Sequence, residues 1–260
     1  MAMNPRLLRP LANFDPRIIA NLGLWLDASE DSSLTFNATT VSEWRDLSGN
    51  GRHMEQDTAV AQPNGVARTK NGRRVLDFGG AQLLSGNAAA LNLATNVGGL
   101  TAFFVSKFDS VAPSQQILFD LQTSQLNSRF ALDAGSGVSP GTAVRLGGRR
   151  LDADAFDAAL GAASSQNSND TVFAGTIAYS AATANLHANG LLVATDGTFQ
   201  TAGNTSNTDS TGIHIGANYL AANGLDGFIA EVIVYQRALS ANERERVERA
   251  LGRKWGITVE

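Results

Sequence analysis

The sequence predicts an all-β fold: an antiparallel two-sheet jelly-roll sandwich with one C-terminal α-helix and an extended N-terminal arm. Three observations favour it. Many short apolar or alternating runs are separated by turn residues, as in sandwiches and barrels. The composition, with 26 glycines and only 17% charged residues, suits strands and turns. A single helical pattern closes the chain. We expect an arm over residues 1–20 and one sandwich over 21–260, since single β-sandwiches of roughly 200–250 residues are common.

The strand signals run from residue 22 to residue 236. Asn189-Gly190, between two alternating runs, is the strongest short hairpin signal that a sequence gives. Stretches rich in Ser, Thr and Asn at 162–170 and 200–211 predict long surface loops. Apart from this hairpin, the predicted strand runs are 22–27, 40–51 with a closing Gly/Asn turn, 73–78, 100–109, 116–121, 128–134, 142–147, 171–180, 212–220 and 227–236.

The last element is predicted to be a helix over about residues 241–253. Ser240 followed by Glu243 forms a capping box, in which each side chain satisfies a free backbone N–H of the first turn. The charged run 243–249 is interpreted as a solvated helix face, with Glu245 and Arg249 as an i, i+4 pair. The narrow stripe predicted to face the sandwich is Val247, Ala250, Leu251 and Lys254.

The bulk properties exclude several classes of protein. The net charge of −4 opposes a general nucleic-acid binder, which needs a basic face. No cysteine is present, so neither disulfides nor thiolate metal sites contribute. We find no signal-peptide-like apolar run at the start and no apolar stretch of roughly 18 residues. We therefore expect a soluble protein without a secretion signal and without membrane insertion.

The arm over residues 1–20 has its own composition. Prolines at positions 5, 10 and 16 oppose a regular helix and favour an extended course. One interpretation is a frayed terminus, which is common in domains. The other is an assembly arm that docks on a neighbouring copy or another protein through apolar and guanidinium groups. The residues that would carry this docking are Arg6, Leu7, Leu8, Arg9, Phe14 and Arg17.

Several motifs resemble one family in their order along the chain. They are GLWLDAS (23–29), WRDLSGNGRH (44–53), HIGA (214–217) and the ending 225–257 with its A-E-V strand and K-W-G. Together they resemble concanavalin A-like lectin/laminin G-like domains of bacterial and phage surface proteins, over roughly residues 22–257. The opening, MAMNPRLLRP and FDPR, is similar to virion proteins of tailed phages, particularly of cyanobacteria. The resemblance implies two packed antiparallel sheets whose end loops serve glycans or protein partners.

The resemblance also bears on whether this chain holds a structural calcium ion. Many relatives hold a structural calcium ion near a D-x-S-G-N-G turn, for which Asp46, Asn50 and Asp226 are the candidates here. Calcium takes roughly six to eight oxygen ligands. Relatives that hold the ion often have an acidic residue where this chain has Ala230, so we expect no tightly bound ion and no cofactor. Asp46 and Asp226 are then turn formers. A second acidic cluster, around 152–157, is interpreted as a solvated turn or short helix.

Tryptophans and histidines are the remaining candidates for function. Trp44 would stack a sugar ring if exposed, but core packing is the interpretation we favour for all three tryptophans. His187 and His214 alternate with apolar neighbours and are predicted on a wet strand face; His53 stands apart. No E-x-D-x-x-E run supplies the paired carboxylates of a β-glucanase, and no G-x-S-x-G elbow occurs. We expect no catalytic residues.

The sequence therefore favours a non-catalytic virion structural protein of a tailed bacteriophage, either decorating the capsid or forming part of a tail or fibre. Its partners would be other virion proteins through the arm, with homo-oligomers in the particle and host-surface glycan as a further ligand. It would be made in the host cytoplasm. The alternative is a carbohydrate-binding module for bacterial or algal surface polysaccharide. A polysaccharide lyase or hydrolase with unfamiliar catalytic residues is the third hypothesis.

Overall fold

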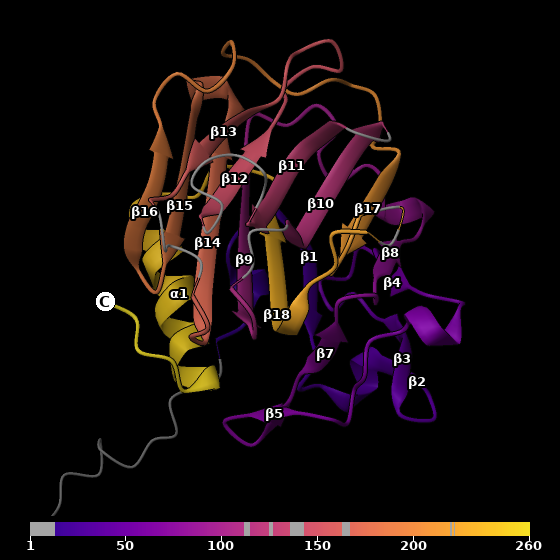
Figure 1. The fold of residues 1–260 in the computed structure, drawn as a ribbon. Coiled ribbons are helices and arrows are strands. Elements are labelled where there is room, and N and C mark those ends of the chain that lie inside the picture. Colours follow the sequence, from indigo (N-terminus) through magenta and orange to yellow (C-terminus); the bar gives the residue numbers. More distant parts are fainter. Residues whose placement is uncertain are drawn as a thin grey trace, which may run out of the picture.

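The computed structural model describes residues 14–111, 115–124, 127–135, 143–162, 167–218, 220 and 222–260. In this part of the chain, two large antiparallel sheets pack face to face, and one helix closes the chain (Figure 1). The predicted all-β sandwich with a C-terminal helix is confirmed.

The first large sheet has seven strands in the described residues. Their order is β1 (Leu22–Asp27), β18 (Asp226–Tyr235), β9 (Leu100–Phe108), β14 (Thr171–Ala178), β15 (Thr183–Ala188) and β16 (Leu191–Asp196), and β7 (Leu76–Gly79) also pairs with β18. A short two-stranded ribbon, β5 (Thr69–Lys70) and β6 (Arg73–Arg74), lies apart from both sheets.

The second large sheet has nine strands in the described residues and carries the groove discussed below. Their order is β13 (Asp157–Leu160), β12 (Val144–Gly148), β11 (Asn127–Ala134), β10 (Gln116–Ser124), β17 (Gly212–Ile215), β8 (Leu84–Gly86), β4 (Met54–Glu55), β3 (Thr40–Trp44) and β2 (Leu34–Asn37). Short 3-10 helices are η2 (Pro16–Ile18), η3 (Asp31–Ser33), η4 (Ala59–Ala61), η5 (Ala88–Ala90) and η6 (Tyr179–Ala181).

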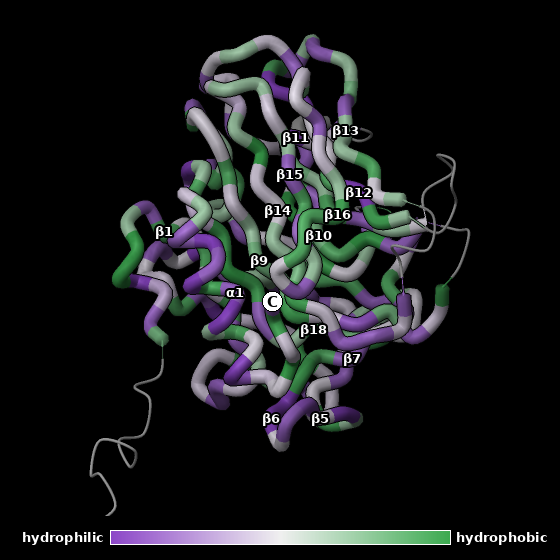
Figure 2. The backbone as a smooth tube through the Cα atoms, turned by 90° about the vertical axis from the view of Figure 1, so that its left-hand side faces the viewer, coloured by the Kyte–Doolittle hydropathy of each residue, from purple (hydrophilic) through white to green (hydrophobic). Residues whose placement is uncertain are grey.

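The centre of the first sheet is buried on both faces, as the strand β9 shows. Side chains alternate across a strand, so Ala102 and Phe104 enter the core between the sheets. Phe103 and Val105 point to the opposite face, into a second core beneath the C-terminal helix. Because both faces are covered, β9 has a nearly continuous hydrophobic sequence, which the hydropathy colours of β9 and β18 also show (Figure 2).

Helix α1 (Ala241–Trp255) covers this second core. The predicted capping box is present, with Ser240 as N-cap and Glu243 bonding back to it. Val247 and Leu251 are buried as predicted, and Glu245 pairs with Arg249 at 3.1 Å. The expectation of a fully solvated charged face is wrong at one position. Glu248 is fully buried, because it points at the sheet rather than at solvent.

Two local predictions concern turns and strand faces. The Asn189-Gly190 hairpin is confirmed: both residues have positive φ, 52° and 89°, and join β15 to β16. The two strand histidines do not lie on a wet face. His187 is half-buried and His214 is only 9% exposed, and burial lowers the pKa of each to about 4.

Five short strands were not predicted: β2, β4, β5, β8 and β13. Each has two to four residues, too few for a visible alternation. The predicted turn or short helix around 152–157 is wrong at its end, because Asp157 opens β13 and pairs with Gly148. The predicted strand over 73–78 divides at Val75, whose buried side chain separates β6 from β7.

The described part of the predicted arm packs on the domain. Ile19 is buried in the second core, and the Tyr235 hydroxyl donates to the Pro16 carbonyl at 3.0 Å. Arg17 lies over the Trp25 ring at 5.5 Å, and Arg246 lies over Phe14 at 5.8 Å. Residues 14–20 therefore contribute to the packing of the sandwich. The other predicted docking residues, Arg6, Leu7, Leu8 and Arg9, lie outside the described residues.

Candidate functional site

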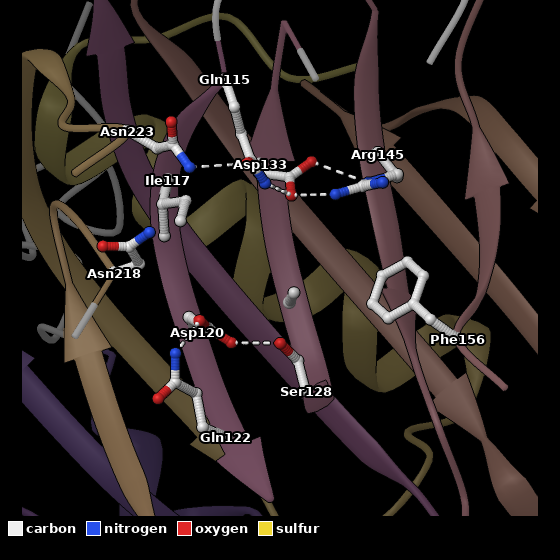
Figure 3. A pocket seen from close by; sticks show the side chains of 11 residues that line it. Gln115, Ile117, Asp120, Gln122, Ser128, Asp133, Arg145, Phe156, Asn218 and Asn223 are labelled. Atoms are coloured by element: carbon white, nitrogen blue, oxygen red, sulfur yellow. Dashed lines mark hydrogen bonds and ion pairs between the residues drawn. The ribbon is translucent and has the colours of Figure 1, made fainter. Parts of the chain in front are cut away.

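A polar groove lies on the outer face of the nine-stranded sheet, away from the core between the sheets. Its volume is about 290 Å³, and it is lined by residues of β10, β11 and β12, by Gln115 and Phe156, and by Asn218 and Asn223 (Figure 3). We call it the outer-face groove and define it by Asp120, Asp133, Arg145 and Phe156. The inward residues of the same strands, such as Leu121 and Leu132, fill the core.

Strand register brings the charged residues of the groove together. Asp133 on β11 is directly opposite Arg145 on β12. Asp120 on β10 lies between Ala131 of β11 and His214 of β17 in one cross-strand row. Directly opposite residues on one face have their Cβ atoms within roughly 5 Å. The groove is therefore a product of pairing between strands, and not of one local motif.

Asp133 and Arg145 neutralise each other. Arg145 donates from Nε to Oδ1 of Asp133 at 3.0 Å and from Nη2 to Oδ2 at 2.5 Å, a two-point contact. Gln115 adds a third donor to the same carboxylate, at 2.7 Å. The guanidinium also lies over the Phe156 ring, 4.9 Å from its centroid. This pair forms a flat, rigid wall of the groove.

Asp120 has no such cation. Its carboxylate accepts hydrogen bonds from Ser128 Oγ at 2.5 Å and from Gln122 Nε2 at 2.7 Å, both uncharged donors (Figure 3). Burial is the main cause that raises the pKa of Asp120, and the charge of Asp133 adds to it, while the two hydrogen bonds oppose the rise. Ionised carboxylates accept up to about four hydrogen bonds. Asp120 therefore keeps acceptor capacity inside the groove.

Small residues let the groove form beside bulky side chains. A Cβ added to Gly147 would lie 2.4 Å from the Phe156 ring, so only glycine lets that ring lie across β12. Ala131, which lines the groove, is paired with Gly147. The rim is made of amides: Asn223 donates to the Gln115 side chain at 2.9 Å. The result is a shallow site with an aromatic wall and a polar floor.

A serine and a histidine lie beside Asp120, but they do not form a catalytic relay with it. Ser85 Oγ is 3.0 Å from His214 Nδ1. Asp120 is opposite His214 in register, yet its carboxylate bonds to Ser128 and Gln122 instead. In a Ser-His-Asp relay, the carboxylate accepts a hydrogen bond from the ring nitrogen of the histidine that does not face the serine. No such bond between His214 and Asp120 is among the contacts of the described residues.

The calcium candidates are placed as structural residues. Asp46 accepts from the backbone N–H of Trp25 at 3.0 Å, Ser48 at 2.9 Å and Arg52 at 3.1 Å, and from the Ser48 hydroxyl at 2.7 Å. These four donors fill its acceptor capacity. Asn50 turns its amide nitrogen, not its oxygen, toward the chain.

Asp226 is an exposed residue that opens β18, on the other sheet. Within the described ranges, no group of three or more His, Cys, Asp or Glu residues could hold a metal ion. Asp46 and Asn50 share one turn, but the structure does not unite them with Asp226 as ligands.

Trp44 cannot stack a sugar, because its side chain is fully buried in the core between the sheets. The sequence alone did not identify Asp120, Asp133 or Arg145 as site residues. A signal was present: each of three consecutive predicted strands carries at least one charged residue within an apolar run. A charged residue placed there faces solvent or a site, since an unpaired charge in the core is costly.

A second cavity of about 330 Å³ lies between α1 and the edge of the seven-stranded sheet. At its base Glu231 accepts from Trp25 Nε1 at 2.9 Å, from Trp255 Nε1 at 2.7 Å and from Lys254 Nζ at 2.7 Å. Lys254 also bridges to Asp27. These five residues form what we call the helix cluster. It explains why the A-E-V strand and the K-W-G ending occur together.

Comparison with known proteins places the chain in a family. A family model described as "Concanavalin A-like lectin/glucanases superfamily" matches residues 78–243, more than half of the chain. The chain belongs to this superfamily. The match includes every strand of the outer-face groove. Among proteins with curated descriptions, none matches the sequence. No helix in the described residues is long and apolar enough to cross a membrane.

Several solved structures share the fold at low sequence identity. The receptor-binding domain of botulinum neurotoxin D has 11% identity and a TM-score of 0.63, with 91% of this chain covering 54% of that one. The binding domain of Paraclostridial Mosquitocidal Protein 1 has 14% identity and a TM-score of 0.60, with 94% of this chain covering 56% of that one. A Trypanosoma rangeli sialidase has 13% identity and a TM-score of 0.59, with 92% of this chain covering 34% of that one. The chain thus spans about half of the two binding domains.

Proposed function

We propose that this superfamily member is a non-catalytic carbohydrate-binding domain whose outer-face groove holds a bacterial or algal surface polysaccharide. The observation that carries the proposal is the groove itself. An aromatic ring, Phe156, lies beside polar side chains that bond one another in fixed positions. Sugar rings present apolar faces and a belt of hydroxyls, and such sites combine an apolar surface with a few placed polar groups.

The fold neighbours support this proposal by analogy of fold alone. One neighbour is a structure of botulinum neurotoxin type C, whose cell entry depends on interaction with two ganglioside molecules. Another is a Trypanosoma rangeli sialidase in complex with the inhibitor DANA. Both have 13% identity or less to this chain, so the groove residues must carry the argument here.

The charges of the groove favour binding over catalysis. Glycoside hydrolysis uses two carboxylates, one on each side of the scissile bond. In the groove, the Asp133 carboxylate is paired with the Arg145 cation and bonded by Gln115, which leaves Asp120 as the carboxylate of the lining without a bonded cation. We therefore expect no reducing ends to be released when the protein is incubated with cell-wall or capsular polysaccharide.

A glycan array followed by calorimetric titration tests the proposal, with Phe156→Ala as the groove variant. Phe36→Ala is the matched control, because Phe36 also lies under an arginine, Arg74 at 5.1 Å, on the distant edge strand β2. We expect Phe156→Ala to weaken binding about tenfold, or about 1.4 kcal/mol, and Phe36→Ala to leave it unchanged. Absence of any array signal, or equal effects of both variants, contradicts the proposal.

The virion role stays a prediction that fits the same activity. A sandwich that presents a glycan site from a rigid scaffold suits a capsid-decorating, tail or fibre protein of a tailed phage. Assembly with other virion proteins would then use Arg6, Leu7, Leu8 and Arg9 of the predicted arm, because Phe14 and Arg17 contact the domain itself. Mass spectrometry of purified virions tests this role, and absence of the chain from the particle contradicts it.

A further inference from the structure

We propose that the outer-face groove selects sugars that carry a free amino group and rejects sugars that carry a carboxylate, with Asp120 as the selecting residue. This inference rests on the proposed carbohydrate binding. It deepens that function by naming the class of ligand: an amine-bearing glycan, such as a de-N-acetylated hexosamine polymer.

The first argument is the charge balance of the groove. Asp120, Asp133 and Arg145 are the ionisable residues among those that line it. Arg145 makes a two-point contact with Asp133, so its charge is matched. His214, opposite Asp120 in the sheet, is neutral at pH 7 because burial lowers its pKa to about 4. Asp120 is therefore the carboxylate of the lining that has no cation bonded to it.

The second argument is the direction of the hydrogen bonds. Gln122 donates its amide N–H to Asp120, and Gln115 donates its own to Asp133. Asn223 in turn donates to Gln115. The amide N–H groups of Gln115, Gln122 and Asn223 are thus turned toward the protein's own acceptors, whereas Asn218 accepts through its carbonyl from the backbone N–H groups of Leu220 and Ala222. Beside Asp120, the lone pairs of its carboxylate that Ser128 and Gln122 do not use are left for a ligand, so this part of the groove favours donors over acceptors.

An ammonium group fits this surface and a carboxylate does not. A primary ammonium offers three donors and a positive charge. Its bond to Asp120 would be charge-assisted, and such bonds are about twice as strong as neutral ones. Ser128 and Gln122 hold Asp120 in place, so little ordering remains to be done on binding. A uronic or sialic acid would bring a third carboxylate beside Asp120 and Asp133, which like-charge repulsion opposes.

Calorimetric titration at pH 6, where sugar amines are protonated, tests the inference with three tetrasaccharides. They are a fully deacetylated glucosamine tetramer, its N-acetylated counterpart and a galacturonic acid tetramer. We expect the glucosamine tetramer to bind at least tenfold more tightly than the acetylated one, and the uronic acid tetramer to bind weakest. Asp120→Asn should abolish the preference for the amine, so that the deacetylated and the acetylated tetramers bind this variant with affinities within about threefold of each other.

Asp57→Asn is the control for attraction of an oligocation to an acidic protein, because Asp57 is exposed and does not line the groove. We expect it to keep the full amine preference. If the acetylated or uronic acid tetramer binds as tightly as the amine, or if Asp57→Asn lowers the preference as much as Asp120→Asn, the inference is overturned while carbohydrate binding stands. If no tetrasaccharide and no array glycan binds, the proposed function itself fails.

Discussion

The helix cluster and the outer-face groove use the same kinds of residue in opposite ways. In the helix cluster, Glu231 accepts from two tryptophan N–H groups and from Lys254, and its side chain is 3% exposed. In the groove, Asp120 accepts from two uncharged side chains and opens into a cavity. Both carboxylates have a pKa raised mainly by burial.

The difference lies in the partners of each carboxylate. Glu231 also borders a cavity, but Lys254 and two tryptophan N–H groups bond to its oxygens, so a cation of the fold matches it. Asp120 faces away from the core and is bonded only by the uncharged Ser128 and Gln122. A buried acid that is paired with a cation of its own fold stabilises a structure, while one that is held in place without a cation can bind a ligand.

The largest effect is expected from Glu231→Ala. The substitution leaves Lys254 and two tryptophan N–H groups without their acceptor beneath α1. Breaking a buried pair costs about 3–5 kcal/mol of unfolding free energy. Urea denaturation measures it, with Glu245→Ala, an exposed helix pair, as the control that should lose less than about 0.5 kcal/mol. A loss below about 1 kcal/mol at Glu231 would remove the structural role that we give to the helix cluster.

Truncation before residue 19 is expected to have the next largest effect, because Phe14 lines the cavity at the helix cluster. Deleting residues 1–18 removes the Pro16 carbonyl that accepts from the Tyr235 hydroxyl. A buried hydroxyl without a partner costs about 1–3 kcal/mol. Deleting residues 1–13 should leave the melting temperature unchanged. Equal melting temperatures for the two truncations would show that residues 14–18 are no part of the sandwich.

Glu248 sharpens the comparison, because it is a buried acid of α1 bonded to a single cation, Arg244. Burial raises its pKa from 4.5 to about 7. The folded state therefore holds this proton more tightly than the unfolded state, and stability falls as the pH rises from 4.5 through 7.

The variant Glu248→Gln cannot titrate at this position. Its unfolding free energy, relative to that of the original chain, should therefore rise by roughly 1–3 kcal/mol between pH 5 and pH 8. Thermal unfolding at both pH values measures this gain. A difference that does not change with pH would mean that Glu248 is ionised as easily as an exposed glutamate.

The smallest effect on stability is expected for Asp120→Asn. Burial disfavours the charged form of Asp120, and no cation is bonded to it. Replacing it with the uncharged asparagine, which has nearly the same shape, should therefore change the unfolding free energy by less than about 1 kcal/mol. The same variant should lose at least tenfold in affinity for an amine-bearing sugar. Denaturation and calorimetry on one preparation compare the two. A large loss of stability would assign Asp120 to the structure, as Glu231 is.

Local signals predicted most of the fold. The Ser240–Glu243 capping box, the Asn189-Gly190 hairpin and the strand at 22–27 each depend on neighbours in sequence, and each is confirmed. The predictions that were wrong depended on distant packing. Glu248 and His214 look like exposed polar residues until the elements that cover them are known.

The groove could not be predicted from the sequence for the same reason. It requires Asp120 to lie beside His214 in register, although 93 residues separate them, together with irregular pairing of β10 and β11 near Ile117 and Gln122. A register shift of one residue turns every side chain to the other face of a sheet. Charged residues inside three apolar strands indicated a special face, but the pairing that joins them is a property of the folded sheet.

Mapping the sugar-binding site by the chemical shifts of the protein's backbone amides tests most directly the claim that the outer-face groove is the binding site. A glucosamine tetramer is titrated into isotopically labelled protein, and the amide signals are followed. We predict that the shifts gather on β10, β11 and β12 around Asp120, Ser128 and Arg145, and that the signals of Trp25, Trp255 and Lys254 stay in place. Shifts that gather at α1 while the groove stays unchanged would contradict the account.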